Sequence, residues 1–230
     1  MIKTIIFDFD GLILDTESPI FRSWQEVYQE HGCELTLEAW APNLGTEDIF
    51  DPVVHLEGLL GRHINRSAIR SGRKPRETTL IEAESILPGV ETYIADAKRL
   101  NMKLAVASNS GRNWVTSHLE RLGLMHHFTV VRCWNDPDAG QRKPQPAVYN
   151  ATLAALHINA DEAIALEDSF NGILSATRAG IFTVAVPNSL TRMIGVGAAD
   201  MELVSMAHMP LEELLGLAET NRSPNQYGSS

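Results

Sequence analysis

An apolar run that ends in two aspartates and a glycine, residues 4–11, constrains this chain most strongly. The near-continuous apolar character of the run is typical of a strand that is buried on both faces of a parallel sheet. Asp8 and Asp10 lie two residues apart at its end, so a strand conformation points both carboxylates to the same side. Gly11 follows, and a glycine lets the backbone turn where a side chain would not fit. The segment predicts a buried strand whose end presents two carboxylates.

Two adjacent carboxylates repel each other, which a fold tolerates when a cation bridges them or when one of them holds a proton. Either arrangement offers useful chemistry, because one aspartate can then bind a metal and act as a nucleophile beside an acid/base partner. The alternative is a strand that leads into an Asx turn with no catalytic role, since Asp and Gly are common turn residues. The rest of the chain decides between these interpretations.

Short apolar runs alternate with helical patterns from residue 90 onward. Strands are expected at residues 104–107, 129–131, 163–166 and 182–186, with helices between them and a last helix near 211–217. Such alternation predicts a parallel sheet with helices on both faces. Residues 16–85, by contrast, show helical patterns and no convincing strand. The predicted fold class is therefore α/β, a parallel sheet core flanked by helices, with an all-helical cap domain inserted after the first strand.

This insertion splits the sheet domain in the sequence. We expect the core to comprise residues 1–15 and 86–220, and the cap to comprise residues 16–85. The last residues, 221–230, are polar and contain Pro and Gly. We therefore expect a disordered tail there.

Further polar residues occur at, or in the loops after, the ends of the other expected strands. They are Ser108 and Asn109, Lys143, and the adjacent pair Glu167 and Asp168. Each has a plain structural explanation when taken alone, such as a turn or helix cap for the first pair and a surface loop for the lysine. In open α/β sheets, however, ligands bind outside the carboxyl ends of the strands, where these groups would meet Asp8 and Asp10. Their joint position favours a functional site.

Four carboxylates and a single lysine would repel each other strongly at one site. A hard dication relieves that repulsion, and Mg²⁺ prefers oxygen ligands and often shares itself with a substrate phosphate. The sequence offers no Cys/His set with zinc spacing. The predicted cofactor is therefore Mg²⁺, and the predicted metal site comprises Asp8, Asp10, Glu167 and Asp168.

The segment from Asp8 to Glu17, DFDGLILDTE, resembles the first signature of the haloacid dehalogenase-like hydrolases, in the branch of small-molecule phosphatases and β-phosphoglucomutase-like enzymes. Ser108, Lys143 and the Glu167–Asp168 pair are similar, in order, to the remaining signatures of that family. The resemblance covers essentially the whole chain up to the tail. It implies a Rossmann-like core with a helical cap between the first and second signatures, and phosphoryl transfer as the reaction.

The resemblance also implies a role for each matching residue. Asp8 would attack phosphorus and form an aspartyl-phosphate, while Asp10 would protonate the leaving oxygen and then take a proton from the hydrolytic water. Mg²⁺ would be held by Asp8, the backbone carbonyl of Asp10 and Asp168, with Glu167 binding directly or through water. Lys143 would add a fixed positive charge.

The remaining candidates would contact the phosphate or the rest of the substrate. Ser108 and neighbouring backbone N–H groups would bind the transferring phosphoryl group, and Asn109 and Gly11 belong to the same set. Thr16 and Glu17 lie at the hinge between core and cap, where they would touch substrate. Thr16 is also expected to cap the first cap helix.

The cap separates a phosphatase from a mutase, because a mutase must hold a second phosphate on the cap. In mutase-like relatives an arginine follows a glycine loop of the cap, whereas this loop, residues 44–48, reads LGTED and is acidic. The departure favours a phosphatase and leaves a β-phosphoglucomutase-like mutase as the alternative. A basic cluster in the cap could supply the missing charge, although a solvent-exposed helix face is its simpler explanation. That cluster comprises Arg62, Arg66, Arg70, Arg73, Lys74 and Arg76.

A metal-binding or regulatory protein without turnover is a third hypothesis, since a fold alone does not establish catalysis. Loss of Asp8 or Lys143 would indicate such a protein. Both residues are present, which favours the enzyme.

Charge and cysteine content exclude other classes of protein. A net charge of −10 argues against a nucleic-acid-binding surface, and two cysteines are too few for a disulfide framework and fit a reducing compartment. No apolar run is long enough for a membrane-spanning helix, and the first run lacks the features of a signal peptide. We therefore expect a cytoplasmic enzyme, a monomer or weak dimer, that acts on a small phosphorylated metabolite without nucleic-acid or membrane partners.

Overall fold

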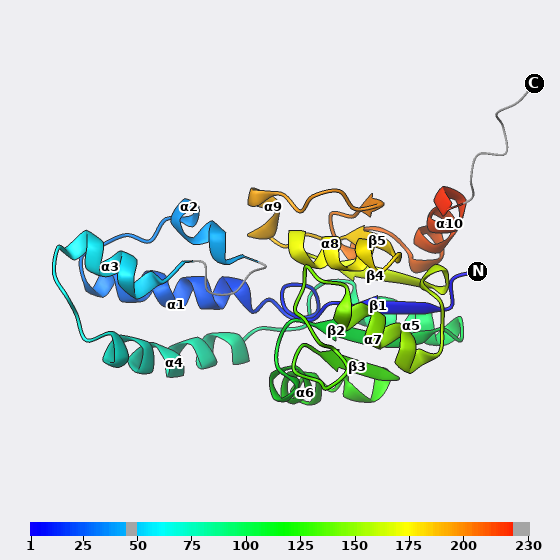
Figure 1. Cartoon of the computed structure of the whole chain (residues 1–230), viewed down its shortest axis with the longest axis horizontal. Coiled ribbons are helices and arrows are strands. Elements are labelled where there is room, and N and C mark those ends of the chain that lie inside the picture. Colours follow the sequence, from blue (N-terminus) through cyan, green and yellow to red (C-terminus); the bar gives the residue numbers. More distant parts are fainter. Residues whose placement is uncertain (45–49, 223–230) are drawn as a thin grey trace, which may run out of the picture.

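The computed structural model describes residues 1–44 and 50–222 of the 230-residue chain. Two parts are visible in Figure 1, a group of helices at the left and a sheet with its own helices at the right. The tail expected to be disordered falls almost entirely outside the described residues, as do residues 45–48 of the acidic cap loop. Among the described helices, none combines the length and apolar character that a membrane span requires.

Six parallel strands form the sheet, in the order β3-β2-β1-β4-β5-β6. Their bounds are β1 Thr4–Phe7, β2 Lys103–Ser108, β3 Val130–Cys133, β4 Ala163–Glu167, β5 Phe182–Ala185 and β6 Met201–Glu202. β1 is central and entirely buried, as its apolar run predicted. The α/β fold class is confirmed. β6 was not predicted, because two residues are too few to form a pattern.

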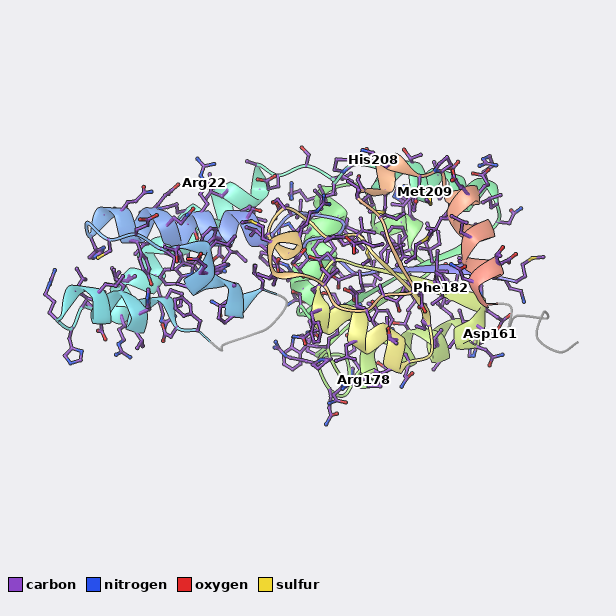
Figure 2. All side chains as sticks on the ribbon, turned by 90° about the horizontal axis from the view of Figure 1, so that it is seen from above. Arg22, Asp161, Arg178, Phe182, His208 and Met209 are labelled. Atoms are coloured by element: carbon purple, nitrogen blue, oxygen red, sulfur yellow. The ribbon has the colours of Figure 1, made fainter. Side chains whose placement is uncertain are left out.

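Helices cover both faces of the sheet. One face carries α5 (Val90–Arg99), α6 (Arg112–Arg121) and α10 (Leu211–Arg222), and the other carries α7 (Ala147–Leu156) and α8 (Phe170–Arg178). Side chains alternate along β1, so Ile5 and Phe7 join the first apolar cluster and Ile6 joins the second. Figure 2 shows side chains filling the space between sheet and helices, whereas Arg178 is exposed at the surface.

The described part of the cap is all helical, as predicted. Its elements are α1 (Glu17–Glu30), α2 (Leu37–Trp40), a 3₁₀ helix at Ala41–Asn43, α3 (Pro52–Leu60) and α4 (Arg66–Glu82). These helices enclose an apolar cluster of their own, in which Trp24, Tyr28 and Leu56 are buried, while Arg22 is exposed (Figure 2). Leu190, from the core, packs into the same cluster, so cap and core share an apolar contact.

Short helices complete the described core. They are helix α9 (Thr191–Ile194) and the 3₁₀ helices Met125–His127, Ala160–Glu162 and Met206–His208. α9 immediately follows Leu190, at the end of the core that faces the cap (Figure 1).

The first cap helix begins after Thr16, as predicted, but the hydroxyl of that residue has another partner. Thr16 directly precedes α1, but its side chain makes no capping hydrogen bond. Its hydroxyl donates instead to Asp10 Oδ1 at 3.0 Å, and Asp15 Oδ1 accepts from the backbone N–H of Ser18 at 2.9 Å. The prediction is therefore right for the position of Thr16 before the helix and wrong for a side-chain cap, because a carboxylate of the core accepts its hydroxyl.

Candidate active site

The carboxyl ends of three neighbouring strands meet at one edge of the sheet. Asp8 directly follows β1, Ser108 ends β2, and Glu167 ends β4 with Asp168 next to it. The strand order places these three ends side by side. Carboxylate oxygens of Asp8, Glu167 and Asp168 all lie within 4.8 Å of one another. The structure thus brings together acidic groups that are about 160 residues apart in the chain.

Lys143 is the cation of this acidic cluster. Its Nζ donates to Asp8 Oδ1 at 2.5 Å and to Glu167 Oε1 at 2.6 Å. Its backbone N–H donates to Asn109 Oδ1 at 2.7 Å, which ties the lysine loop to the loop after β2. The hydroxyl of Tyr149, which sequence reasoning missed, donates to Glu167 Oε1 at 2.5 Å. The lysine is therefore shared between two carboxylates that are each less than a tenth exposed.

Burial controls ionisation in the cluster. It raises the pKa of Asp8 to about 8, although the Lys143 ammonium opposes the shift, and it raises the pKa of Asp168 well above its ordinary value. Burial by itself would lower the pKa of Lys143, but the carboxylates of Asp8 and Glu167 raise it. The lysine is therefore charged, and the carboxylates of Asp8 and Asp168 need a further cation to be fully ionised near neutral pH.

The donor set fits a hard divalent cation. Three buried carboxylates carry more negative charge than Lys143 balances, and Glu167 Oε2 is buried with no hydrogen-bond partner in the described part of the chain. The cluster offers only oxygen ligands, which suits Mg²⁺ better than zinc. The structure thus has an acidic metal-binding site that the charge argument had predicted.

Asp10 lies beside this cluster and has its own set of donors. Its Oδ1 accepts from the Thr16 hydroxyl at 3.0 Å and from Trp114 Nε1 at 2.9 Å. Its Oδ2 accepts from the Ser110 hydroxyl at 2.6 Å, with the Ser108 hydroxyl farther away at 3.4 Å. Ser110 and Trp114 were not predicted, although both follow β2 at the functional edge of the sheet.

Gly11 has a steric role at the end of β1. Its φ of +83° disfavours other residues, and a Cβ there would lie 2.2 Å from Asp168 Oδ2. Asn188 donates to the same Asp168 oxygen at 2.8 Å and to the Gly11 carbonyl at 3.4 Å. Asn188 was missed, although it follows the strand expected at 182–186 and the strand-end rule would have indicated it.

A cavity of about 760 Å³ lies between the core and the cap. Its lining includes most of the predicted site residues: Asp8, Asp10, Thr16, Glu17, Ser108, Asn109, Lys143 and Asp168. Gly11 lies outside this lining, and Glu167 lies behind it, fully buried. The cap contributes aromatic rings and charged groups: Trp24, Trp40, Phe50, Asp51, Arg70, Arg73, Lys74 and Glu77. The size is typical of small-molecule sites, so a metabolite would contact core and cap together.

The basic cluster of the cap is more than a solvent-exposed face. Arg70, Arg73 and Lys74 line the cavity, and the Arg73 side chain is only 12% exposed. The Arg73 guanidinium lies 4.3 Å from the centroid of the Trp24 ring. The interpretation as a solvated face is therefore wrong for Arg73, because α4 packs along α1 and encloses it.

Comparisons with known proteins agree with this geometry. A family model described as haloacid dehalogenase-like hydrolase matches residues 5–186. A Bacillus subtilis (strain 168) protein named "Putative phosphatase YhcW" is 40% identical over 215 residues, which cover 94% of this chain and 97% of that protein. A Thermotoga maritima protein named "Phosphorylated carbohydrates phosphatase" is 24% identical over 215 residues, with the same coverage.

A solved structure is similar over nearly the full length. It is a crystal structure of a CbbY variant from Rhodobacter sphaeroides in complex with xylulose-(1,5)bisphosphate, 26% identical with a TM-score of 0.71. The match covers 93% of this chain and 99% of that one. The family model and the 40% identical relative each extend over most of the chain, and the residues matched by the family model include the strands that carry the acidic cluster. The chain therefore belongs to the haloacid dehalogenase-like hydrolase family, as an enzyme of the phosphatase type.

Proposed function

We propose that this protein is a Mg²⁺-dependent phosphatase that hydrolyses a small phosphorylated sugar through an aspartyl-phosphate on Asp8. The observation that carries the proposal is the buried Asp8–Lys143 pair, joined at 2.5 Å, which lines the cavity beside the carboxylate of Asp168. A nucleophilic carboxylate must approach an anionic phosphoryl group. Positive charge held next to it offsets that repulsion.

The acidic cluster supplies the proposed metal ligands. Asp8, Asp168 and the backbone carbonyl of Asp10 would hold Mg²⁺, with Glu167 binding directly or through water. When bound, Mg²⁺ supplies charge stabilisation for the equatorial oxygens of the phosphoryl group. Lys143 adds a second positive charge that is fixed by its hydrogen bonds to Asp8 and Glu167.

Asp8 and Asp10 divide the proposed chemistry between them. A carboxylate oxygen of Asp8 forms a bond to phosphorus while the bond from phosphorus to the ester oxygen breaks. Asp10 gives a proton to that ester oxygen, so the dephosphorylated product leaves as an alcohol. Asp10 then takes a proton from a water that attacks phosphorus. The bond between Asp8 and phosphorus breaks, and inorganic phosphate is released.

The cap side of the cavity supports a substrate with several hydroxyl groups. Trp24, Trp40 and Phe50 offer ring surface, and the Asp51–Arg70 ion pair at 2.6 Å offers hydrogen-bonding groups close to them. Apolar surface with a few placed polar groups is what a small-molecule site uses to orient its ligand. The names of two relatives, one with phosphorylated carbohydrates and one with a xylulose bisphosphate, support the same class of substrate.

The charges of the cap support a phosphatase over a mutase. A mutase needs a cation on the cap that is available to a second phosphate. Of the described cavity residues, the cap cations Arg70, Arg73 and Lys74 each contact a carboxylate of the cap. Two carboxylates, Asp51 and Glu77, thus engage all three cations and offset most of their positive charge. The acidic loop residues Glu47 and Asp48, which also favoured a phosphatase, lie outside the described residues.

A screen for phosphate release tests the proposal. The panel comprises phosphorylated sugars, phosphoglycolate and nucleotides, each with Mg²⁺ and with a chelator. We expect release from at least one phosphorylated sugar, its loss in the chelator and its return when Mg²⁺ is added back. Activity that persists in the chelator contradicts the metal role, and release from no compound contradicts the phosphatase. With β-glucose 1-phosphate, glucose 6-phosphate as the product would identify a mutase.

Replacing Asn188 by alanine is expected to weaken Mg²⁺ binding. Its Nδ2 donates to Asp168 Oδ2 at 2.8 Å, and loss of such a partner of a metal ligand typically costs about 10–100-fold in metal affinity. We expect the Mg²⁺ concentration that gives half-maximal activity to rise about tenfold. The Mg²⁺ concentration needed to raise the thermal midpoint of unfolding by a given amount should increase by a similar factor.

Thr191→Val is the matched control for this measurement. The Thr191 hydroxyl accepts from the backbone N–H of Asn188 at 3.0 Å, a bond in the same loop that does not involve Asp168. Both Mg²⁺ titrations should stay at their wild-type values in this variant. Equal Mg²⁺ titrations for Asn188→Ala and the wild type would rule out the orienting role.

A further inference from the structure

Trp114 holds the carboxylate of Asp10 from the first turn of α6. Its indole Nε1–H donates to Asp10 Oδ1 at 2.9 Å, and its ring lines the cavity. We propose that Trp114 is a positioning residue, which keeps Asp10 turned so that its other oxygen faces the leaving group. This inference rests on the proposed phosphatase function, in which Asp10 gives its proton to the ester oxygen.

The indole is anchored to the strand end that carries both aspartates. Its ring meets His118 edge-on, with centroids 4.4 Å apart, and His118 stacks on Phe9 with centroids 6.3 Å apart. Phe9 lies between Asp8 and Asp10 in the chain and is fully buried. Burial lowers the pKa of His118, so the ring is neutral in this stack. The position of the N–H is thus tied to the backbone that places Asp10, rather than to a mobile surface segment.

Trp114 differs in kind from the other donors to Asp10. The hydroxyls of Thr16 and Ser110 can rotate and either donate or accept, whereas an indole N–H only donates. Oδ1 is therefore always an acceptor while the Trp114 bond exists. The other oxygen, Oδ2, lies 2.6 Å from the Ser110 hydroxyl and 3.4 Å from that of Ser108, on the side of the proposed phosphoryl-binding residue. Because the Trp114 bond occupies Oδ1 of Asp10, Oδ2 of Asp10 is the oxygen that transfers the proton.

The chemistry gives this role a distinctive signature. Protonation of the ester oxygen matters for a sugar phosphate, because an alkoxide is a poor leaving group. It matters little for p-nitrophenyl phosphate, whose leaving group is stable as an anion. The ratio kcat/KM reports the steps up to departure of the leaving group. A positioning residue for the acid should therefore affect kcat/KM for the two substrates unequally.

Trp114→Phe tests the inference, since phenylalanine keeps a ring against His118 and removes the N–H. We expect kcat/KM for the best sugar phosphate to fall about tenfold and that for p-nitrophenyl phosphate to fall less than about threefold. Most of the loss should appear in kcat, with KM little changed. An equal fall in kcat/KM for both substrates would mean general damage to the site. No fall for either would mean that the hydrogen bond from Trp114 does not contribute to the reaction. Either result overturns the inference.

Two further variants keep the test decisive. In an Asp10→Ala background, Trp114→Phe should change kcat/KM less than about twofold, because the indole acts only through the missing carboxylate. A full additional loss there overturns the inference. Trp134→Phe is the control for removal of an indole N–H, since Trp134 does not line the cavity and its ring packs under Arg142 at 3.9 Å. An inactive wild-type enzyme would refute the phosphatase itself, whereas an active wild type with an insensitive Trp114→Phe variant refutes only this role.

Discussion

Asparagine in place of Asp8 is expected to abolish phosphate release while the fold is retained. The amide is neutral and too weak a nucleophile to form the acyl-phosphate, so turnover of a sugar phosphate and of an aryl phosphate should both fall by at least about 10⁴-fold. The side chain keeps its size, which leaves the packing around the strand end intact. Asp161→Asn, at an exposed aspartate of the core (Figure 2), is the control and should retain full activity. Near-normal turnover in Asp8→Asn would refute the nucleophile assignment.

The stability of the metal-free protein provides an independent check on Asp8. Its pKa rises from an ordinary value of 3.8 to about 8 on folding, chiefly because it is buried. The folded state therefore binds this proton more tightly than the unfolded state does. The free energy of unfolding is highest, as far as Asp8 is concerned, below pH 3.8, where the group is protonated in both states, and it falls as the pH rises toward 8. With a chelator present, Asp8→Asn should thus have a higher thermal midpoint than the wild type at pH 7–8. A lower midpoint would contradict the view that, without metal, burial of the Asp8 carboxylate costs more than its pairing with Lys143 returns.

Lys143→Met is expected to lose both activity and stability. Removing the ammonium leaves Asp8 and Glu167 without their shared cation in a site where the lysine is only 3% exposed. Breaking a buried ion pair in this way costs about 3–5 kcal/mol in the free energy of unfolding, measured by urea titration with a chelator. Phosphate release should fall by about 10²–10³-fold, because a charge aimed at the transferring group is gone.

Two further variants show whether the loss of stability comes from the buried position of Lys143 or from the removal of any lysine. Lys3→Met removes a pair of similar length, 2.6 Å to Glu162, but Lys3 is 62% exposed, so the urea midpoint should stay close to that of the wild type. Adding Asp8→Asn to Lys143→Met should recover part of the lost stability, since one of the unpaired carboxylates is then neutral. If Lys143→Met unfolds at the same urea concentration as the wild type, the lysine is not the cation that balances the cluster.

The sheet could be predicted because its main strands are buried on both faces. Strands such as Lys103–Ser108 and Ala163–Glu167 therefore stand out as apolar runs, and their alternation with helical patterns indicates parallel order. Met201–Glu202 was missed because a two-residue edge strand has no periodicity. The hydroxyl of Thr16 was misassigned as a helix cap because it has a choice of partners, and the partner it takes, Asp10, becomes a neighbour only after the turn at Gly11.

The acidic part of the site could also be predicted, since residues at the carboxyl ends of parallel strands gather at one edge whatever the rest of the chain does. The residues that hold this site in place could not. Trp114 contacts Asp10 across 104 positions, Asn188 contacts Asp168 across 20, and Tyr149 contacts Glu167 across 18. No regular spacing links such pairs, because each is created by the packing of one element against another.

The sequence by itself determined the order of strands and helices and the chemical groups at the strand ends. Both follow from local pattern. Apolar periodicity distinguishes a helix from a strand, and residues at the carboxyl end of a parallel strand lie at one known edge of the sheet. Only the tertiary structure decided which charges are paired and which face the cavity. Arg73 shows why, since its sequence neighbours mark it as a surface residue, yet packing of the cap helices places it over Trp24 and against Glu77. Pairing depends on distances across elements, and those distances are set by long-range packing rather than by position in the chain.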